Sequence, residues 1–230
     1  MNKALLRQGN KNSLSFDGVN DYVSVALSQQ LNNFTTSLWF KWTSQSGDDT
    51  MLFENVNWWT NAASFMLLLR RHTHLTIPRK MTIGVKVNNS AGNFSEFASN
   101  TEFQDDTWYH VAVVADGTNI IFYVNSVVDV SVVANRNASI SSVRMGDRHI
   151  SGTPLLGNID RVRCYSRPLS HDEIKLLYRG IEPSNTDLKL SYDFKEGTGT
   201  STKDLSGNNN NGTLINGVAW STDVPIWGGV

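Results

Sequence analysis

The stretch GNIDRVRCYSRPLSHDEIKLLYRG, residues 157–180, decides the fold class. Its first half alternates apolar and polar side chains, which is the pattern of a half-buried strand. A helix start follows, because Ser170 can cap the helix and Glu173 can complete the capping box. Gly180 is placed to close the helix at its C-terminus. The stretch therefore predicts one strand and then one short helix near 170–179.

The rest of the chain consists of short segments rich in β-branched and aromatic residues. Each is bounded by Gly, Asn, Asp or Ser, which are the residues that turns favour. The predicted strands are 21–27, 36–42, 64–70, 81–87, 109–116, 119–125, 127–133, 159–165 and 187–194. Many short strands separated by turn signals indicate a sandwich or a barrel.

Composition narrows the function classes. The chain has 230 residues, 20 basic and 21 acidic side chains, and a formal net charge of -1, which argues against a nucleic-acid binder. Cys164 is the single cysteine, so the chain has no internal disulfide. Residues 1–16 lack the apolar core of a signal peptide, and no segment has the ~20 apolar residues of a membrane span.

Five segments taken together resemble the laminin-G-like, concanavalin A-like jelly-roll family, which is close to the pentraxins. They are LSFDGVNDYVSV (14–25), TWYHVAVVADG (107–117), IIFYVNS (120–126), residues 157–180, and LKLSYDFKEGTGTSTKDLSGNNNNGTL (188–214). The resemblance implies an all-β, two-sheet antiparallel jelly-roll sandwich with one short helix. One departure is Ser126, which stands where the family usually has Gly after Asn, so the type of this turn is open.

The domain organisation rests on where residues 187–223 pair. We expect 1–230 to form a single laminin-G-like domain, with 187–223 closing the sandwich beside the N-terminal strands. The alternative is a truncated second repeat, which would leave an unpaired sheet edge.

The resemblance also implies calcium, which many members of the family bind. Carboxylates and amides are suitable Ca²⁺ ligands. Two turns supply them, and the candidate ligands are Asp17, Asn20, Asp21, Asp204 and Asn208. The alternative is that these residues only form Asx turns and left-handed positions.

Two further groups are candidate ligand-binding residues. Trp58 and Trp59 are adjacent, so on a strand they would face opposite ways, and one of them is expected in a loop, at a rim or against a partner. There it could stack on a sugar or cover the base of a loop.

The second group is basic, and its members are Arg70, Arg71, His72 and His74. Such a patch could hold an anionic glycan, or it could be a solvated hairpin loop.

Catalysis is not expected. Glycosidases with this sandwich commonly carry E-x-D-x-x-E on one strand, and the chain has neither this pattern nor G-x-S-x-G, H-E-x-x-H or a P-loop. Asp160 is interpreted as structural, and Cys164 as a buried thiol.

The sequence therefore predicts a non-catalytic binding or adhesion module for a glycan or a protein surface. The alternative is a structural virion component, a phage head-decoration or tail-fibre protein that docks on capsid or tail proteins. A glycoside hydrolase is a minor alternative.

Without a signal peptide, the expected location is a virion, or a cell surface reached by a non-classical route, or otherwise the cytoplasm. The oligomeric state is left open.

Overall fold

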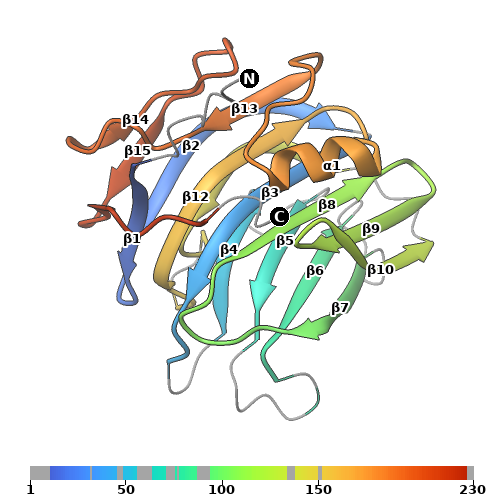
Figure 1. Cartoon of the computed structure of the whole chain (residues 1–230), viewed down its shortest axis with the longest axis horizontal. Helices are drawn as coiled ribbons and strands as arrows, with labels where there is room; N and C mark the ends of the chain where they lie inside the picture. The colour runs from blue at the N-terminus through green and yellow to red at the C-terminus, as the bar shows by residue number, and fades with distance from the viewer. Residues whose placement is uncertain are drawn as a thin grey trace, which may run out of the picture.

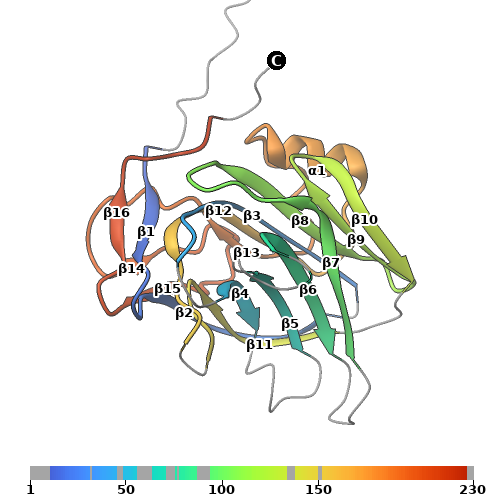
Figure 2. The same ribbon diagram turned by 90° about the horizontal axis from the view of Figure 1, so that it is seen from below.

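The computed structural model describes residues 11–31, 33–45, 49–55, 64–70, 76, 78–86, 94–133, 138–149 and 152–226. In this part of the chain two antiparallel sheets stack face to face, and one short helix lies outside them (Figures 1 and 2). This is the all-β jelly-roll sandwich that the sequence predicts. No helix within these ranges is long and apolar enough to cross a membrane.

One sheet, here called sheet A, has the strand order β10-β9-β8-β3-β12-β1-β16, and β13 also pairs with β12. Its strands are β1 (Ser13–Asp17), β3 (Phe34–Trp42), β8 (Tyr109–Ala115), β9 (Asn119–Val124), β10 (Val127–Val133), β12 (Leu156–Tyr165), β13 (Leu188–Tyr192) and β16 (Ala219–Ser221).

The other sheet, sheet B, has the order β14-β15-β2-β11-β4-β5-β6-β7. Its strands are β2 (Tyr22–Leu31), β4 (Thr50–Asn55), β5 (Ser64–Leu69), β6 (Lys80–Lys86), β7 (Phe94–Glu102), β11 (Ala138–Met145), β14 (Ser201–Thr202) and β15 (Gly212–Ile215).

Each predicted strand overlaps an observed one, but the sequence missed several others, including β4, β7 and β11. All six residues of β4 are buried, so the strand shows no alternation of polar and apolar side chains. β7 contains Ser, Asn and Glu, and β11 contains three Ser residues, and these residue types are less typical of strands than β-branched and aromatic ones. They become strands because neighbouring strands supply their hydrogen-bond partners.

β12 joins two parts of sheet A that are far apart in sequence. Its first residues pair with β1, where Leu14 lies opposite Ile159. Its last residues pair with β13, where Arg163 lies opposite Ser191. Between the two halves Arg161 has a positive φ of 47°, and the ladder to β3 shifts register there. The strand quoted at the outset therefore has partners from both ends of the chain.

The C-terminal segment contributes to both sheets. β15 pairs with β2, with Leu214 opposite Val23, and β16 pairs with β1, with Trp220 opposite Leu14. β15 and β16 therefore lie beside the N-terminal strands, whereas β13 pairs with β12. This placement is visible at the edge of the molecule where β1, β2, β14 and β15 gather (Figure 1).

The core lies between the sheets and is rich in aromatic rings. Phe34 of sheet A and Phe65 of sheet B meet edge to face, with ring centroids 5.1 Å apart. Cys164 is also fully buried there, as predicted. A separate small buried cluster consists of Met51, Met66 and Leu68 of sheet B.

The helix, α1 (His171–Tyr178), begins as the sequence predicts. Ser170 Oγ accepts from the backbone of Glu173, and the Glu173 carboxylate accepts from Ser170 N, so the capping box is complete. The Arg167 guanidinium, bonded to the Glu173 carboxylate, lowers the pKa of Glu173 to about 2. Gly180 follows the helix with φ 68°, which a glycine adopts at low cost.

The β9–β10 turn has left-handed backbone at both central residues, Asn125 and Ser126. Asn125 and Ser126 have φ values of 48° and 66°, which are the angles of a type I′ turn. Asn125 is held in place because its side-chain oxygen accepts from His110 N at 2.9 Å.

Candidate functional site

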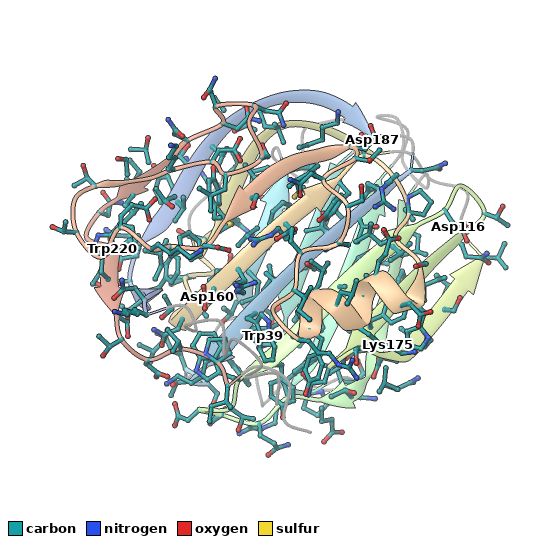
Figure 3. All side chains as sticks on the ribbon, turned by 45° about the horizontal axis from the view of Figure 1, so that its top comes forward. Trp39, Asp116, Asp160, Lys175, Asp187 and Trp220 are labelled. Atoms are coloured by element: carbon teal, nitrogen blue, oxygen red, sulfur yellow. The ribbon has the colours of Figure 1, made fainter. Side chains whose placement is uncertain are left out.

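The outer face of sheet A is covered by α1. Ile174 and Leu177 of the helix pack against Ala112 and Val114 of β8 in one buried cluster. At the C-terminal end of the helix Tyr178 stacks on Trp39, with ring centroids 5.4 Å apart. Trp39 lies close to the helix in Figure 3. This part of the face therefore serves packing.

The segment after β16 also crosses the outer side of sheet A, and Asp223 fastens it. The Asp223 carboxylate pairs with Lys41 and accepts from Trp108 Nε1 at 2.9 Å. Its backbone carbonyl accepts from Ser13 Oγ at 2.6 Å. The segment up to residue 226 consequently lies on the same side of the sandwich as α1 (Figure 2).

A cavity of about 10 Å³ lies beneath α1, next to Ser37, Trp39 and His110. It has room for about one water molecule. Ser37 Oγ, Trp39 Nε1 and His110 Nδ1 are buried there without a hydrogen-bond partner in the described part of the chain. Burial lowers the pKa of His110 from its ordinary 6.5 to about 3, so the ring is neutral at pH 7. The cavity is too small for a sugar.

The outer face of sheet B differs where β15, β2 and β11 form it. Along β11, Val143 and Met145 point into the core, so Ser142 and Arg144 point outward. Arg144 lies opposite Glu54 of β4, which therefore shares this face. Half-exposed or exposed side chains occupy the neighbouring positions, and they are Tyr22, Ser24, Ala26, Thr213 and Ile215.

Five side chains on this face form what we call the Arg144 cluster. They are Tyr22, Glu54, Ser142, Arg144 and His149. The Arg144 guanidinium lies over the Tyr22 ring, 4.0 Å from its centroid. Arg144 Nη1 also donates to the carbonyl of Arg148 at 2.9 Å. These two contacts hold the guanidinium in one orientation.

The other three members are bonded in series. Ser142 Oγ lies 3.3 Å from His149 Nε2, and His149 Nδ1 lies 2.9 Å from Glu54 Oε2. The same Glu54 oxygen accepts from His149 N at 2.8 Å. The Glu54 side chain is 2% exposed and the His149 side chain 17%, so the carboxylate is buried beneath the ring. The series fixes the orientation of the imidazole.

Hydroxyl, imidazole and carboxylate follow one another in this order in serine hydrolases. Such an enzyme also needs backbone N–H groups that face the developing oxyanion. Ser142 pairs with Ala26 of β2, and the next three residues of β11 pair with β2 on one side and β4 on the other. The backbone N–H groups of a strand paired on both sides are used by the ladders. The arrangement is therefore better suited to hydrogen bonding with a ligand than to acyl transfer.

The predicted calcium ligands are distributed over two turns. Asp17 and Asp21 lie together, because Asp17 N donates to Asp21 Oδ2 at 3.1 Å. Asp21 is 2% exposed, its Oδ1 has no hydrogen-bond partner among the described residues, and burial raises its pKa. Asn20 is exposed beside it, and its carbonyl accepts from Asn216 Nδ2 at 3.0 Å.

Asp204 is occupied by its own loop. Its Oδ1 accepts from Ser191 N and Ser206 N, and its Oδ2 accepts from Ser206 Oγ and Asn210 N, all at 2.7–3.0 Å. Asn208 Nδ2 donates to the carbonyl of Leu188 at 2.9 Å. The amide-rich loop thus satisfies the open edge of β13. Within the described ranges no three His, Cys, Asp or Glu side chains form a group that could hold a metal ion.

The predicted sugar- and anion-binding residues fall mostly outside the described residues, which do not include Trp58, Trp59, Arg71, His72 or His74. Arg70 is described, and it is engaged internally. It pairs with Asp49 and with Glu96, each at 2.6 Å, and donates to Thr82 at 2.8 Å. Arg70 therefore holds strands of sheet B together.

The two residues interpreted as structural have internal contacts. Asp160 is fully buried and accepts from Arg161 N at 2.8 Å. Burial raises the pKa of the Cys164 thiol to about 12, so it is no nucleophile at pH 7.

The sequence did not reveal the Arg144 cluster. Three of its members, Ser142, Arg144 and His149, belong to β11 or the loop after it, and β11 was not recognised as a strand. The alternation of Ile140, Val143 and Met145 with polar residues is the available signal, but a register shift between Ile140 and Ser142 interrupts it.

The chain is similar to a known family in sequence and to solved structures in fold. A family model for the concanavalin A-like lectin/glucanases superfamily matches residues 17–175. A solved structure from Bacteroides ovatus, described as a carbohydrate-binding protein, is similar with a TM-score of 0.71 and 18% identity. The match covers 95% of this chain and 62% of that one, so the chain spans less than two thirds of that protein.

Two further structures share the fold. The SAP-like pentraxin of Limulus polyphemus has a TM-score of 0.55 and 14% identity, over 72% of this chain and 80% of that one. Domain 4 of the arabinanase AbnA of Geobacillus stearothermophilus, solved with arabinotriose, has a TM-score of 0.51 and 17% identity, over 65% and 68%. No curated protein sequence matches the chain.

Proposed function

The chain belongs to the concanavalin A-like lectin/glucanases superfamily, and from this premise we propose that it is a non-catalytic module that binds a glycan. The proposal is supported by the Bacteroides ovatus protein, described as carbohydrate binding, and by the arabinanase domain solved with arabinotriose. The observation that carries it is the Arg144 cluster, which combines an aromatic ring with several hydrogen-bonding groups at the surface. A sugar site needs both.

The contact surface in this proposal is the outer face of sheet B around β2 and β11. Sheet A is occupied on its outer side by α1 and by the segment that Asp223 fastens. Tyr22 and Arg144 are half-exposed, whereas Trp39 and Trp42 are buried. A ligand therefore meets aromatic and polar groups together at Tyr22 and its neighbours.

Binding of the purified full-length chain to an array of immobilised glycans tests the proposal. We expect binding to a subset of glycans, and we expect Tyr22→Ala to weaken it at least about tenfold through loss of ring contact. Tyr178→Ala is the matched control, because it removes a half-exposed tyrosine from the opposite side of the sandwich. Melting curves of both variants establish that they fold. Absence of binding to every glycan contradicts the proposal.

The other readings of the sequence have less support. The matches to known proteins give no support to a virion component or to capsid and tail partners. Recognition of a protein surface stays a prediction, as do the roles of Trp58, Trp59, Arg71, His72 and His74.

Calcium binding is a separate part of the proposal, and we place it at the turn of Asp17, Asn20 and Asp21. The support is the buried Asp21 Oδ1, which lacks a hydrogen-bond partner among the described residues. A cation beside this oxygen would offset the cost of burying the carboxylate. Asp204 and Asn208 are left out, because their side chains bond to the C-terminal loop and to β13.

Calorimetry with Ca²⁺ and melting curves in Ca²⁺ or EDTA test the cation site. We expect Ca²⁺ to raise the melting temperature of the natural chain and of Asp172→Asn, whose carboxylate is exposed on α1. Asp21→Asn should lose the response. No heat of binding, together with an unchanged melting temperature, rejects calcium while leaving the glycan proposal intact.

A further inference from the structure

We infer that the glycan bound at the Arg144 cluster carries an anionic group, either a carboxylate or a sulfate. Arg144 is the residue that recognises this group. The inference rests on the proposed function and names the ligand class of the same site. It is carried by three observations: the lack of an internal carboxylate partner for Arg144, its fixed orientation, and the placement of charges around it.

Arg144 differs from four other arginines of the fold, Arg70, Arg79, Arg163 and Arg167, in having no internal carboxylate partner. Arg70, Arg163 and Arg167 each pair with a carboxylate at 2.5–2.8 Å. Within the described part of the chain no carboxylate oxygen comes within 4.0 Å of the Arg144 guanidinium. Its capacity for charge-assisted hydrogen bonds is thus not used by an internal ion pair.

The guanidinium is also oriented in advance. Its carbon lies over the Tyr22 ring, 4.0 Å from the ring centroid, and the Arg148 carbonyl accepts a hydrogen bond from Nη1. Stacking on an aromatic ring leaves the N–H groups pointing outward in the plane of the guanidinium. Two parallel N–H groups match the two oxygens of a carboxylate or sulfate. Because the side chain is already held, less conformational entropy is lost on binding.

Four charged or titratable groups surround Arg144, and they are Glu54, Asp147, Arg148 and His149. The two carboxylates are buried, with Asp147 at 3% and the Glu54 side chain at 2% exposure. Both are bonded internally: Glu54 to His149, and Asp147 to the backbone N–H groups of Arg148 and Thr153.

The half-exposed members of the group are basic, Arg144 and Arg148, with His149 beside them. Negative charge therefore lies beneath the surface and positive charge at it. Ser142 and His149 add hydrogen-bonding groups next to the guanidinium, which suit the hydroxyl groups of a sugar.

Affinity electrophoresis of the full-length chain through gels that contain a polysaccharide tests this inference. Two pairs of probes differ only in the anionic group: polygalacturonate and its carboxyl-reduced form, and dextran sulfate and dextran. We expect an acidic member to retard the protein, and its neutral counterpart to bind at least about tenfold more weakly, because a charge-assisted bidentate contact is lost. The polygalacturonate pair tests recognition of a carboxylate, and the dextran pair tests recognition of a sulfate.

Two variants separate specific recognition from general charge attraction. Arg144→Gln and Arg179→Gln each remove one positive charge, and Arg179 lies exposed at the end of α1 on the opposite side. We expect Arg144→Gln to lose at least about tenfold in affinity, Arg144→Lys to lose less, and Arg179→Gln to stay within about twofold. Melting curves show whether each variant folds.

Equal loss in Arg144→Gln and Arg179→Gln, or equal binding of the acidic and neutral probes, overturns the inference. Binding to neutral glycans alone overturns it while leaving the proposed function in place. Absence of binding to any of the four probes and to the glycan array overturns both.

Discussion

Two arginines on opposite outer faces of the sandwich, Arg163 and Arg144, have opposite kinds of neighbours. Beneath the α1 side of sheet A, Arg163 is buried and bonds Glu182 at 2.8 Å and Asp193 at 2.5 Å. On sheet B, Arg144 is half-exposed and has an aromatic ring and a carbonyl as its neighbours instead of a carboxylate. The comparison teaches that one sandwich can use guanidinium groups for cohesion on one face and keep another available on the opposite face.

The largest expected effect is on sheet A. Arg163→Ala leaves the Glu182 and Asp193 carboxylates without their guanidinium, and we expect the free energy of unfolding to fall by about 3–5 kcal/mol. Arg179→Ala, which removes an exposed arginine, should change it by less than about 0.5 kcal/mol. Urea unfolding of the three proteins measures the difference. A loss under about 1 kcal/mol for Arg163→Ala would mean that this network is no tighter than a surface ion pair.

The next effect is the acid sensitivity of sheet A, which His110 should dominate. The pKa of His110 is about 3 in the folded chain and near 6.5 when unfolded, so the unfolded chain takes up the proton first. The stabilisation is complete above about pH 6.5 and is lost as the pH falls toward 3, with a limiting slope of about 1.4 kcal/mol per pH unit.

Unfolding experiments between pH 7 and pH 4 measure this slope. His110→Phe keeps an aromatic ring beside Trp39 but cannot take up a proton, so its stability should fall less over the same interval. A parallel decline of the natural chain and the variant would assign the acid sensitivity to other groups.

On sheet B the expected cost in stability is smaller. Tyr22→Ala removes a half-exposed ring whose described partner is Arg144, and we expect it to lower the free energy of unfolding by less than about 1 kcal/mol. The same variant should lose most of its glycan binding. A loss of stability similar to that of Arg163→Ala would show that both faces serve cohesion and would remove the contrast between them.

The smallest expected effect is on hydrolysis. We expect the natural chain and Ser142→Ala to release p-nitrophenol from p-nitrophenyl acetate at the same rate, close to the rate with His149→Ala. The reason is that the ladders of β11 use the N–H groups that an oxyanion hole would need. A rate that falls in Ser142→Ala, with labelling of Ser142 by a fluorophosphonate, would reverse the non-catalytic reading.

The sequence was sufficient for the parts of the fold that have strong local signals. The capping box at Ser170 and Glu173 involves four consecutive residues, and a local pattern of this kind needs no knowledge of the tertiary structure. The positive φ values at Asn125 and Ser126 also follow from the local Asn signal, even though Ser replaces the usual Gly.

The candidate site could not be predicted in the same way. Tyr22, Glu54 and Ser142 come from β2, β4 and β11, and only the register of the ladders brings them together. The Asn-rich loop shows the reverse case: its composition is visible in the sequence, but Asp204 acts on β13 through hydrogen bonds that no spacing rule reveals. Local chemistry predicted local structure, whereas long-range pairing determined the site.

The position of β1 has a consequence for the time course of folding. β1 lies between β12 and β16, and β2 lies between β11 and β15, so both strands have neighbours that are synthesised much later. Closing such distant pairs is slow, because the loop entropy is lost before the contacts form. During synthesis the apolar residues of β1 and β2 stay without their sheet neighbours until the last strands emerge. We expect nascent chains that end before β12 to bind a chaperone, and release to require β15 and β16.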